Sequence, residues 1–266
     1  MTARNMLVHR CLKCGMMFCS MEQPSSYEWG KDPFFSDNAL TLKAKDAIAL
    51  KTLASIKNYL GADIAKINIL EVGTGEGHLA NLFITQGAHY TGIEPSAYFF
   101  NSAIKRYPAL QGKIRNGGIE NAVLPKQAFD LIVLTDVLEH VPNPVVFLKT
   151  LNNLLHPKGR IFIEIPDESN FSWMSFLRIF LRLYGGYPTH PQHISLFTPS
   201  TARHAVEGSG FRIDSLAQAS LLSDTDRLIV LAKGRLMGTL KVLGPLLAPT
   251  GLLGGRLMIS GQKDTA

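Results

Sequence analysis

The sequence predicts an α/β protein whose doubly wound sheet has seven strands, most of them parallel. Three observations support this fold class. Short apolar segments alternate with segments of helical spacing, a glycine-rich turn joins one such pair, and polar residues follow the ends of the apolar segments. Alternating strands and helices build a parallel sheet, in which ligands bind outside the carboxyl ends of the strands.

The glycine-rich turn lies within Leu70–Asn81, LEVGTGEGHLAN. It follows the apolar run Ile67–Val72 and precedes a segment with helical spacing. Gly73, Gly75 and Gly77 permit backbone conformations and a close approach that a Cβ would block. The free N–H groups of the new helix point into the turn, so we expect a nucleotide-like ligand there.

Two acidic residues help to identify that ligand. A dinucleotide turn reads G-x-G-x-x-G, whereas the spacing here is G-x-G-x-G. Glu71 precedes the first glycine, where a carboxylate repels a pyrophosphate but attracts the ammonium group of an amino-acid moiety. Glu94 ends the next strand segment, HYTGIEPS, where an acid accepts both ribose hydroxyls. Together they favour an adenosyl amino acid over NAD.

Three stretches, Glu71–Asn81, Gly92–Pro95 and Phe129–Pro144, resemble the successive motifs of class I S-adenosylmethionine-dependent methyltransferases. The subgroup resembled includes the quinone and small-molecule O-methyltransferases and the sugar methyltransferases. The resemblance implies S-adenosyl-L-methionine as cofactor, with methyl transfer to an oxygen, carbon or nitrogen of a sugar, quinone or lipid-like acceptor. The implied cofactor-binding residues are Glu71, Gly73, Gly75, Gly77, Glu94, Glu120 and Asp136.

Glu120 is the least direct of these assignments. In the resembled family an acid after the third strand often contacts the adenine amino group, but that position is Gly118 here. Glu120, two residues later, or backbone groups at Ile119 are the candidate substitutes.

Composition bounds the remaining possibilities. The chain has 266 residues and a net charge of +6, without a long basic run, so we expect no nucleic-acid partner. No apolar run reaches the roughly 18 residues that a membrane-spanning helix needs, and the N-terminus lacks the apolar core of a signal peptide. We therefore expect a cytoplasmic protein. A peripheral membrane contact is an alternative to a solvated basic face.

All three cysteines lie near the N-terminus, in HRCLKCGMMFCS. Cys11 and Cys14 have the spacing of one zinc knuckle, and His9 and Cys19 are the other candidate ligands nearby. Some sugar C-methyltransferases carry an N-terminal zinc ribbon, of which this segment resembles a remnant. Free thiols are the alternative, and we assign no residue of the chain as a metal ligand. We assign residues 1–30 to this extension and its linker, and residues 31–266 to the methyltransferase domain.

Polar residues crowd the end of the apolar run Phe129–Thr135, which predicts a strand buried on both faces. Asp136 is a candidate for orienting cofactor or substrate, and Glu139 is expected to face solvent. His140 titrates near neutral pH, so it is a candidate general base. A structural role through a backbone hydrogen bond is its alternative.

The segment Asn170–Gly186 interrupts the alternation of strands and helices. Insertions at this point in the resembled enzymes build the lid over the acceptor, so the resemblance implies a helical lid insertion at about residues 168–197. Its apolar surface and two arginines also suit a membrane-surface helix. Tyr187, His190 and His193 follow in a proline-rich loop and are candidate acid/base groups. The loop resembles an H-x-S-x-F element of the family, but Pro191 replaces the first of the two histidines of sugar C-methyltransferases.

The resemblance implies that the C-terminal run Arg256–Gln262 forms the seventh, antiparallel strand, and that the helix predicted at Asp37–Leu60 covers the cofactor. The predicted activity is methyl transfer to a small-molecule acceptor, with His193 as the first candidate for the base and His140 as the second. The alternative is a non-catalytic scaffold of the same fold in a membrane-associated biosynthetic assembly.

Overall fold

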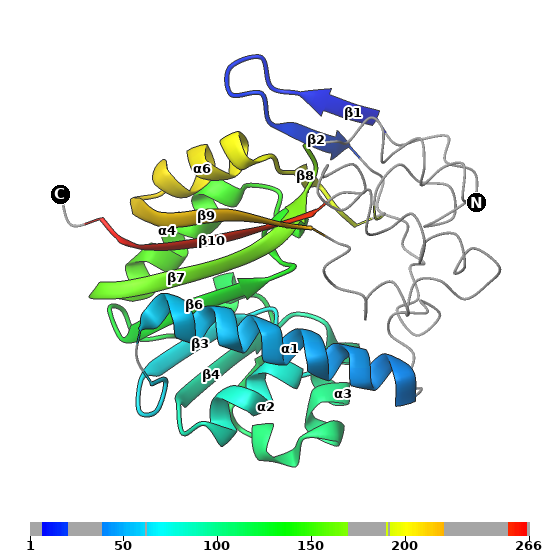
Figure 1. Cartoon of the computed structure of the whole chain (residues 1–266), viewed down its shortest axis with the longest axis vertical. Coiled ribbons are helices and arrows are strands. Elements are labelled where there is room, and N and C mark those ends of the chain that lie inside the picture. The colour runs from blue at the N-terminus through cyan, green and yellow to red at the C-terminus, as the bar shows by residue number, and fades with distance from the viewer. Residues whose placement is uncertain are drawn as a thin grey trace.

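A computed structural model describes residues 7–20, 39–61, 63–169, 190, 192–220 and 255–264. They include a seven-stranded sheet of order β5-β4-β3-β6-β7-β10-β9 (Figure 1). Only β10 runs antiparallel to its neighbours, so the predicted fold class is confirmed, and so is the antiparallel seventh strand. The strands are β3 (Asn68–Val72), β4 (His89–Glu94), β5 (Ile114–Asn116), β6 (Phe129–Thr135), β7 (Leu155–Asp167), β9 (Phe211–Ser220) and β10 (Gly255–Lys263).

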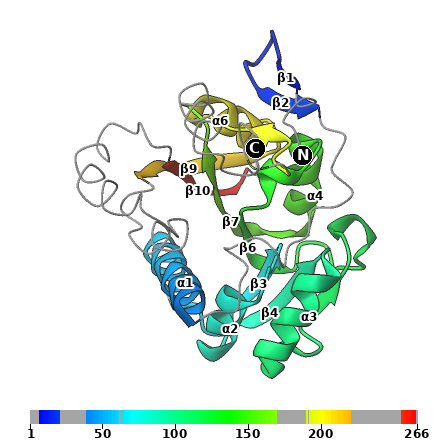
Figure 2. The same ribbon diagram turned by 90° about the vertical axis from the view of Figure 1, so that its right-hand side faces the viewer.

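Helices cover both faces of this sheet (Figures 1 and 2). One apolar core lies between the sheet and α1, α2 and α3, and the other lies between the sheet and α4 and α6. In the central strands β3, β6 and β7, residues are divided between the two cores, which explains why these strands are mostly apolar. The helices are α1 (Ala39–Leu60), α2 (His78–Thr85), α3 (Ala97–Arg106), α4 (Pro144–Leu154) and α6 (Pro199–Glu207).

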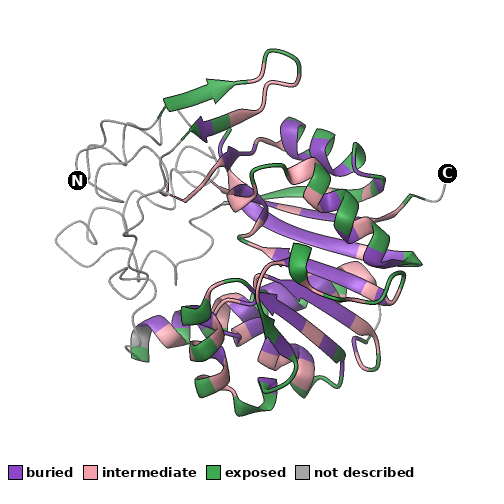
Figure 3. Cartoon of the chain, turned by 180° about the vertical axis from the view of Figure 1, so that it is seen from behind, coloured by how far each residue is buried: buried purple, intermediate pink, exposed green. Residues whose placement is uncertain are grey.

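Strand β6 shows this division most clearly. Leu131 and Val133 pack toward α1 and α2, whereas Ile132 and Leu134 pack toward α4. All four side chains are fully buried, as the purple strands of Figure 3 show. The predicted strand buried on both faces is therefore confirmed.

Side-chain caps set the starts of the helices. Ser96 accepts a hydrogen bond from the N–H of Phe99 at the start of α3, and serine is a residue type that favours this position. Asn143 caps α4 by accepting from the N–H of Val146 at 3.2 Å. Thr198 and Thr201 form a reciprocal capping box at the start of α6.

From the sequence, a helix is predicted at Pro144–His156, stopped by Pro157 and Gly159, with a strand at Arg160–Ile165. The structure differs at the end of α4. The helix ends at Leu154 because Leu155 is extended and pairs with Phe129. Strand β7 consequently begins at Leu155 and not at Arg160. Pro157 and Gly159 thus lie inside a long strand and do not stop the helix.

A second, smaller sheet joins the N-terminal hairpin to the histidine-containing loop. It consists of β1 (Leu7–Arg10), β2 (Met17–Ser20) and β8 (Ser195–Leu196), in the order β1-β2-β8. The N–H of Cys19 also donates to the carbonyl oxygen of Ile194 at 2.8 Å. The first strands of the chain therefore support the loop that carries His193.

Cys11 and Cys14 lie in the turn of this hairpin, and Cys19 belongs to β2 and has a buried side chain. Within the described part of the chain, no cysteine belongs to a group of three candidate metal ligands. His9 instead shares a hydrogen bond with Ser20. The zinc-ribbon interpretation thus has no structural support and stays a prediction.

Two predicted segments fall outside the described residues. They are the lid helix within Asn170–Gly186, followed by Tyr187, and the segment Asp224–Leu247, whose composition predicts a largely helical structure. None of the helices in the described ranges is long and apolar enough to cross a membrane.

Candidate functional site

The glycine turn connects β3 to α2 and is held against the end of β4. All three predicted glycines adopt left-handed conformations, with φ of 81°, 53° and 81° at Gly73, Gly75 and Gly77. A Cβ added at Gly77 would lie 2.6 Å from Leu110, so this glycine permits close packing of α2. A Cβ added at Gly75 would meet no atom within 4 Å. Gly75 therefore faces open space, where a ligand can approach the backbone.

Glu94 lies at the end of β4 directly beside this turn. Its Oε2 accepts a hydrogen bond from the N–H of Gly75, and its Oε1 accepts from the N–H of Ser96, both at 2.8 Å. The carboxyl group is buried, and burial raises its pKa against the opposing effect of the two N–H donors. The predicted glycine and acid are thus brought together, with lone pairs on both oxygens left for further donors.

Glu71 is buried near the end of β3 and faces α1. Its Oε2 accepts a hydrogen bond of 2.6 Å from the phenol of Tyr90. Burial raises the pKa of Glu71 to about 8, although the Tyr90 hydrogen bond lowers it. A carboxyl group in this state is poised to lose its proton when a cation binds next to it.

A cavity of about 140 Å³ lies between α1 and the carboxyl ends of the central strands. Its lining contains charged side chains from five segments: Lys45, Glu71, Glu76, Asp136, Glu164 and Arg256. Lys45 of α1 forms a buried ion pair with Glu76 of the glycine turn. This ion pair therefore holds helix α1 over the turn, and the role of the helix in covering the cofactor stays a prediction.

Asp136 follows β6 and has a left-handed backbone with φ of 54°. Its N–H donates to the carbonyl oxygen of Glu164, and its Oδ1 lies 2.7 Å from Nη2 of Arg256. Arg256, from β10, also forms an ion pair with the carboxylate of Glu164. Burial lowers the pKa of the Arg256 guanidinium, but the charges of Asp136 and Glu164 outweigh burial and raise it. Arg256 thus fixes Asp136 at the rim of the cavity.

Glu120 lies in a short 3₁₀ turn after β5 and is exposed. Its carboxyl group folds back over Gly118, so closely that a Cβ added at Gly118 would overlap it. Asn116, at the end of β5, donates to the carbonyl oxygen of Glu94 at 2.8 Å. Glu120 therefore lies on the same sheet edge as Glu94, and its contact with adenine stays a prediction.

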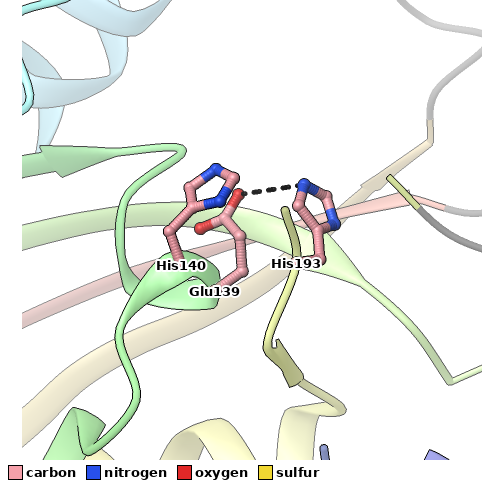
Figure 4. A group of neighbouring side chains, drawn as sticks. All are labelled: Glu139, His140 and His193. Atoms are coloured by element: carbon pink, nitrogen blue, oxygen red, sulfur yellow. Dashed lines mark ion pairs between the residues drawn. The ribbon is translucent and has the colours of Figure 1, made fainter. Parts of the chain in front are cut away.

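Glu139, His140 and His193 form a cluster beyond the carboxyl end of β6 (Figure 4). The first two belong to a 3₁₀ turn after β6, and His193 precedes β8. Oε1 of Glu139 lies 4.0 Å from Nε2 of His193, and Nδ1 of His193 lies 4.0 Å from Oε1 of Glu168. The His140 and His193 rings are 5.0 Å apart between centroids. The two histidines predicted as alternative bases are thus neighbours.

The two residues of the turn have shifted pKa values. Burial and then the negative charge of Asp136 raise the pKa of Glu139 well above its usual range. The expectation that Glu139 faces solvent is wrong, since its side chain is only 2% exposed. Nδ1 of His140 lies 2.9 Å from the carbonyl oxygen of Gln192, and burial lowers the pKa of this imidazole.

The structure adds four residues to which the sequence assigned no role: Lys45, Glu76, Glu168 and Arg256. Each is buried and charged, and each forms an ion pair that joins distant segments. A usable signal existed for Arg256, because an arginine at the start of an apolar strand requires an acidic partner if it is buried. Nothing in the sequence places Glu168 beside His193.

The methyltransferase domain family matches residues 46–216 of the chain, which is more than half of its length. The chain therefore belongs to this family. It is 33% identical over 113 residues to a ubiquinone biosynthesis O-methyltransferase of Aeromonas salmonicida, covering 41% of this chain and 47% of that protein. It is 28% identical over 201 residues to the mitochondrial ubiquinone biosynthesis O-methyltransferase of Mus musculus, covering 71% of this chain and 53% of that protein. The matches thus span about half the length of these curated relatives.

Solved structures share the fold. An S-adenosylmethionine-dependent methyltransferase from Mesorhizobium loti superposes with a TM-score of 0.56 at 18% identity, covering 80% of this chain and 98% of that one. The [4+2]-cyclase SpnF superposes equally well, with a TM-score of 0.56 at 15% identity and 86% of each chain covered. A fold shared with a cyclase shows that the reaction must be argued from the site.

Proposed function

We propose that the chain is an S-adenosyl-L-methionine-dependent methyltransferase that acts on a small-molecule acceptor. The observation that carries this proposal is the pair of buried acids at the glycine turn: Glu71 lines the cavity, and Glu94 accepts a hydrogen bond from the N–H of Gly75, whose Cβ position is open. Family membership and the similarity to ubiquinone biosynthesis O-methyltransferases support it.

The acids suit the two ends of this cofactor. Glu71 lines the cavity, where its carboxylate would hold the ammonium group of the methionine moiety. Glu94 would accept the ribose hydroxyls with its remaining lone pairs, while Gly75 admits the cofactor close to the backbone. Asp136 borders the cavity and would orient the cofactor or acceptor, and Glu120 would lie toward the adenine. When bound, S-adenosylmethionine supplies a sulfonium methyl group, which is already a strong electrophile.

The protein's remaining task is to align the acceptor and remove its proton. His193 is the first candidate for that base, because its two nitrogens face the acids Glu139 and Glu168 and 15% of its side chain is exposed. His140 is the second, since its Nδ1 already faces the Gln192 carbonyl oxygen. Sugars, quinols and lipid-like phenols are the acceptors to test, for O-, C- or N-methylation.

The test is release of S-adenosylhomocysteine from S-adenosylmethionine in the presence of these acceptors, one class at a time. With an active acceptor, His193→Ala should lower turnover about 100-fold or more, with cofactor affinity changed less than about twofold. His204→Ala, on the exposed side of α6, is the matched control and should leave both unchanged. Equal loss of turnover and cofactor affinity in His193→Ala would assign His193 a structural role.

Cofactor binding without turnover on any acceptor would favour the non-catalytic scaffold, which is the alternative function of this fold. Turnover of an acceptor therefore distinguishes the two functions, whereas cofactor binding does not.

A further inference from the structure

We propose that His78 binds the ammonium group at the amino-acid end of the cofactor, with its Nε2 as hydrogen-bond acceptor. The proposal rests on the proposed function and adds a side chain that has had no role in it so far. His78 is the first residue of α2 and lines the same cavity as Glu71. Its side chain is only 10% exposed.

The ring of His78 is held by groups from two other segments. Helices α1, α2 and α3 lie together on one face of the sheet (Figures 1 and 2). Nδ1 of His78 lies 2.7 Å from Oδ1 of Asp46 in α1, and 3.0 Å from the phenol oxygen of Tyr107, which follows α3. The His78 and Tyr107 rings also meet edge to face, with their centroids 5.6 Å apart. The ring is therefore oriented before any ligand binds.

Asp46 determines which ring nitrogen carries the proton. A carboxylate can only accept hydrogen bonds, so Nδ1 of His78 donates to it, and a neutral ring keeps its lone pair on Nε2. Burial lowers the pKa of His78 and outweighs the opposing effect of Asp46, so the ring is neutral at pH 7. His78 thus offers the cavity a hydrogen-bond acceptor and not a donor.

Nε2 of His78 is buried and has no hydrogen-bond partner among the residues that the structure describes. The same holds for Oγ1 of Thr74, a second residue that lines this cavity. Buried polar atoms are normally hydrogen-bonded, so two unpaired atoms in the lining of one cavity indicate a ligand with polar hydrogens. The hydroxyl oxygen of Thr74 can accept such a hydrogen as well.

The other charged groups of the cavity point to a cationic ligand group. Apart from Glu71, they are held in ion pairs with one another: Lys45 with Glu76, and Arg256 with Asp136 and Glu164. Glu71 is thus the acid left for a ligand. An ammonium group next to Glu71 has three N–H donors, and a buried donor without an acceptor is unfavourable. Nε2 of His78 and Oγ1 of Thr74 supply the further acceptors.

This arrangement selects a ligand with a free, protonated α-amino group. A site built to bind a ligand N–H rejects an analogue that lacks it, because the buried acceptors of the site are then left unpaired. His78 and Thr74 touch the ligand in this account. Asp46 acts only through the His78 ring and is a positioning residue.

The test is calorimetric titration of the full-length protein with three ligands: S-adenosylhomocysteine, its analogue without the α-amino group, and 5′-methylthioadenosine, which lacks the amino-acid end. His78→Ala should weaken binding of S-adenosylhomocysteine at least tenfold and change the affinity for the other two less than about twofold. His89→Ala is the matched control, because His89 is exposed and lies at the amino end of β4, at the opposite edge of the sheet from the cavity. It should bind all three ligands as the natural protein does.

Nitrogen NMR of the histidine rings supplies a second measurement on the natural protein. In the free protein His78 should carry its proton on Nδ1, and its Nε2 resonance should shift when S-adenosylhomocysteine binds but not when the analogue without the amino group binds. Asp46→Asn allows both tautomers, so it should mix them and weaken S-adenosylhomocysteine binding several-fold.

Two results would overturn the role of His78 while leaving the proposed function intact. One is unchanged S-adenosylhomocysteine affinity in a folded His78→Ala variant, together with an unshifted Nε2 resonance in the natural protein. The other is an equal loss of affinity for the analogue without the amino group. If the natural protein binds none of the three ligands, the proposed function fails together with this inference.

Discussion

Tyr90 donates a 2.6 Å hydrogen bond to Oε2 of Glu71, and both side chains are buried between the sheet and its covering helices. This pair links the second strand of the sheet to the acid that precedes the glycine turn. Burial outweighs the hydrogen bond and raises the pKa of Glu71 to about 8. At neutral pH the carboxyl group of Glu71 therefore keeps its proton in the free protein, and a bound ammonium group would favour loss of that proton.

Cofactor affinity should accordingly rise with pH between about 6 and 8. In this range Glu71 is largely protonated in the free protein and becomes ionised in the complex, so binding releases a proton. Titration with S-adenosylhomocysteine in buffers of different ionisation enthalpy measures this release. Tyr90→Phe removes the donor that lowers the pKa of Glu71, so it should weaken binding at pH 7 more than at pH 9. Binding that is independent of pH would separate Glu71 from the ammonium site.

The same acid should make folding stability depend on pH. Below the ordinary carboxyl pKa, Glu71 is protonated in both states and has no effect. As the pH rises toward 8, the unfolded chain loses the proton that the folded chain keeps, so stability falls, by at most about 5 kcal/mol. Glu71→Gln cannot ionise, so its stability relative to the natural protein should increase from pH 5 to pH 8. Urea unfolding at both pH values measures the difference, and parallel curves would contradict the assignment.

Gly75 and Gly61 form a matched pair for testing the glycine turn. Both have left-handed backbones, with φ of 53° and 62°, and neither has an atom within 4 Å of an added Cβ. Alanine at either position should cost about 1–2 kcal/mol of stability through backbone strain alone. Only Gly75→Ala should weaken S-adenosylhomocysteine binding, by tenfold or more, because only Gly75 lies against Glu94. Equal affinities in the two variants would remove Gly75 from the binding site.

Arg256 should contribute far more stability than a surface arginine. Replacing it by Met leaves the buried Glu164 and the nearby Asp136 without their cation, at a cost of about 3 kcal/mol or more. The comparison is Arg203→Met, which breaks an exposed pair with Glu207 on α6 and should cost under about 0.5 kcal/mol. Denaturant unfolding of the two variants measures both losses. Similar losses would mean that the Arg256 pairs are not coupled to folding.

The sequence predicted the fold well because the signals are local and repeated. Uninterrupted apolar runs such as Phe129–Thr135 require burial on both faces, and Ser96 marks a helix start by its own side chain. The end of α4 could not be predicted in this way. Leu155 leaves the helix to pair with Phe129, and that competition between helix and sheet exists only in three dimensions.

Part of the site could also be predicted from local sequence signals. Glu71 and Glu94 could be assigned because each lies near the end of a predicted strand and within a motif of its own. The structure brings Glu94 to Gly75 as expected. The exposure of Glu139 was predicted wrongly, since its burial depends on a turn packed beneath β8. Glu168 and Arg256 have partners that lie far away in the sequence, so only the structure reveals them.

Calorimetric titration with S-adenosylhomocysteine, with NAD as the control ligand, tests the central claim most directly. The two buried acids and the open face of Gly75 predict micromolar binding of S-adenosylhomocysteine and none of NAD. Binding of NAD, or no binding of either ligand by a folded sample, would contradict the account.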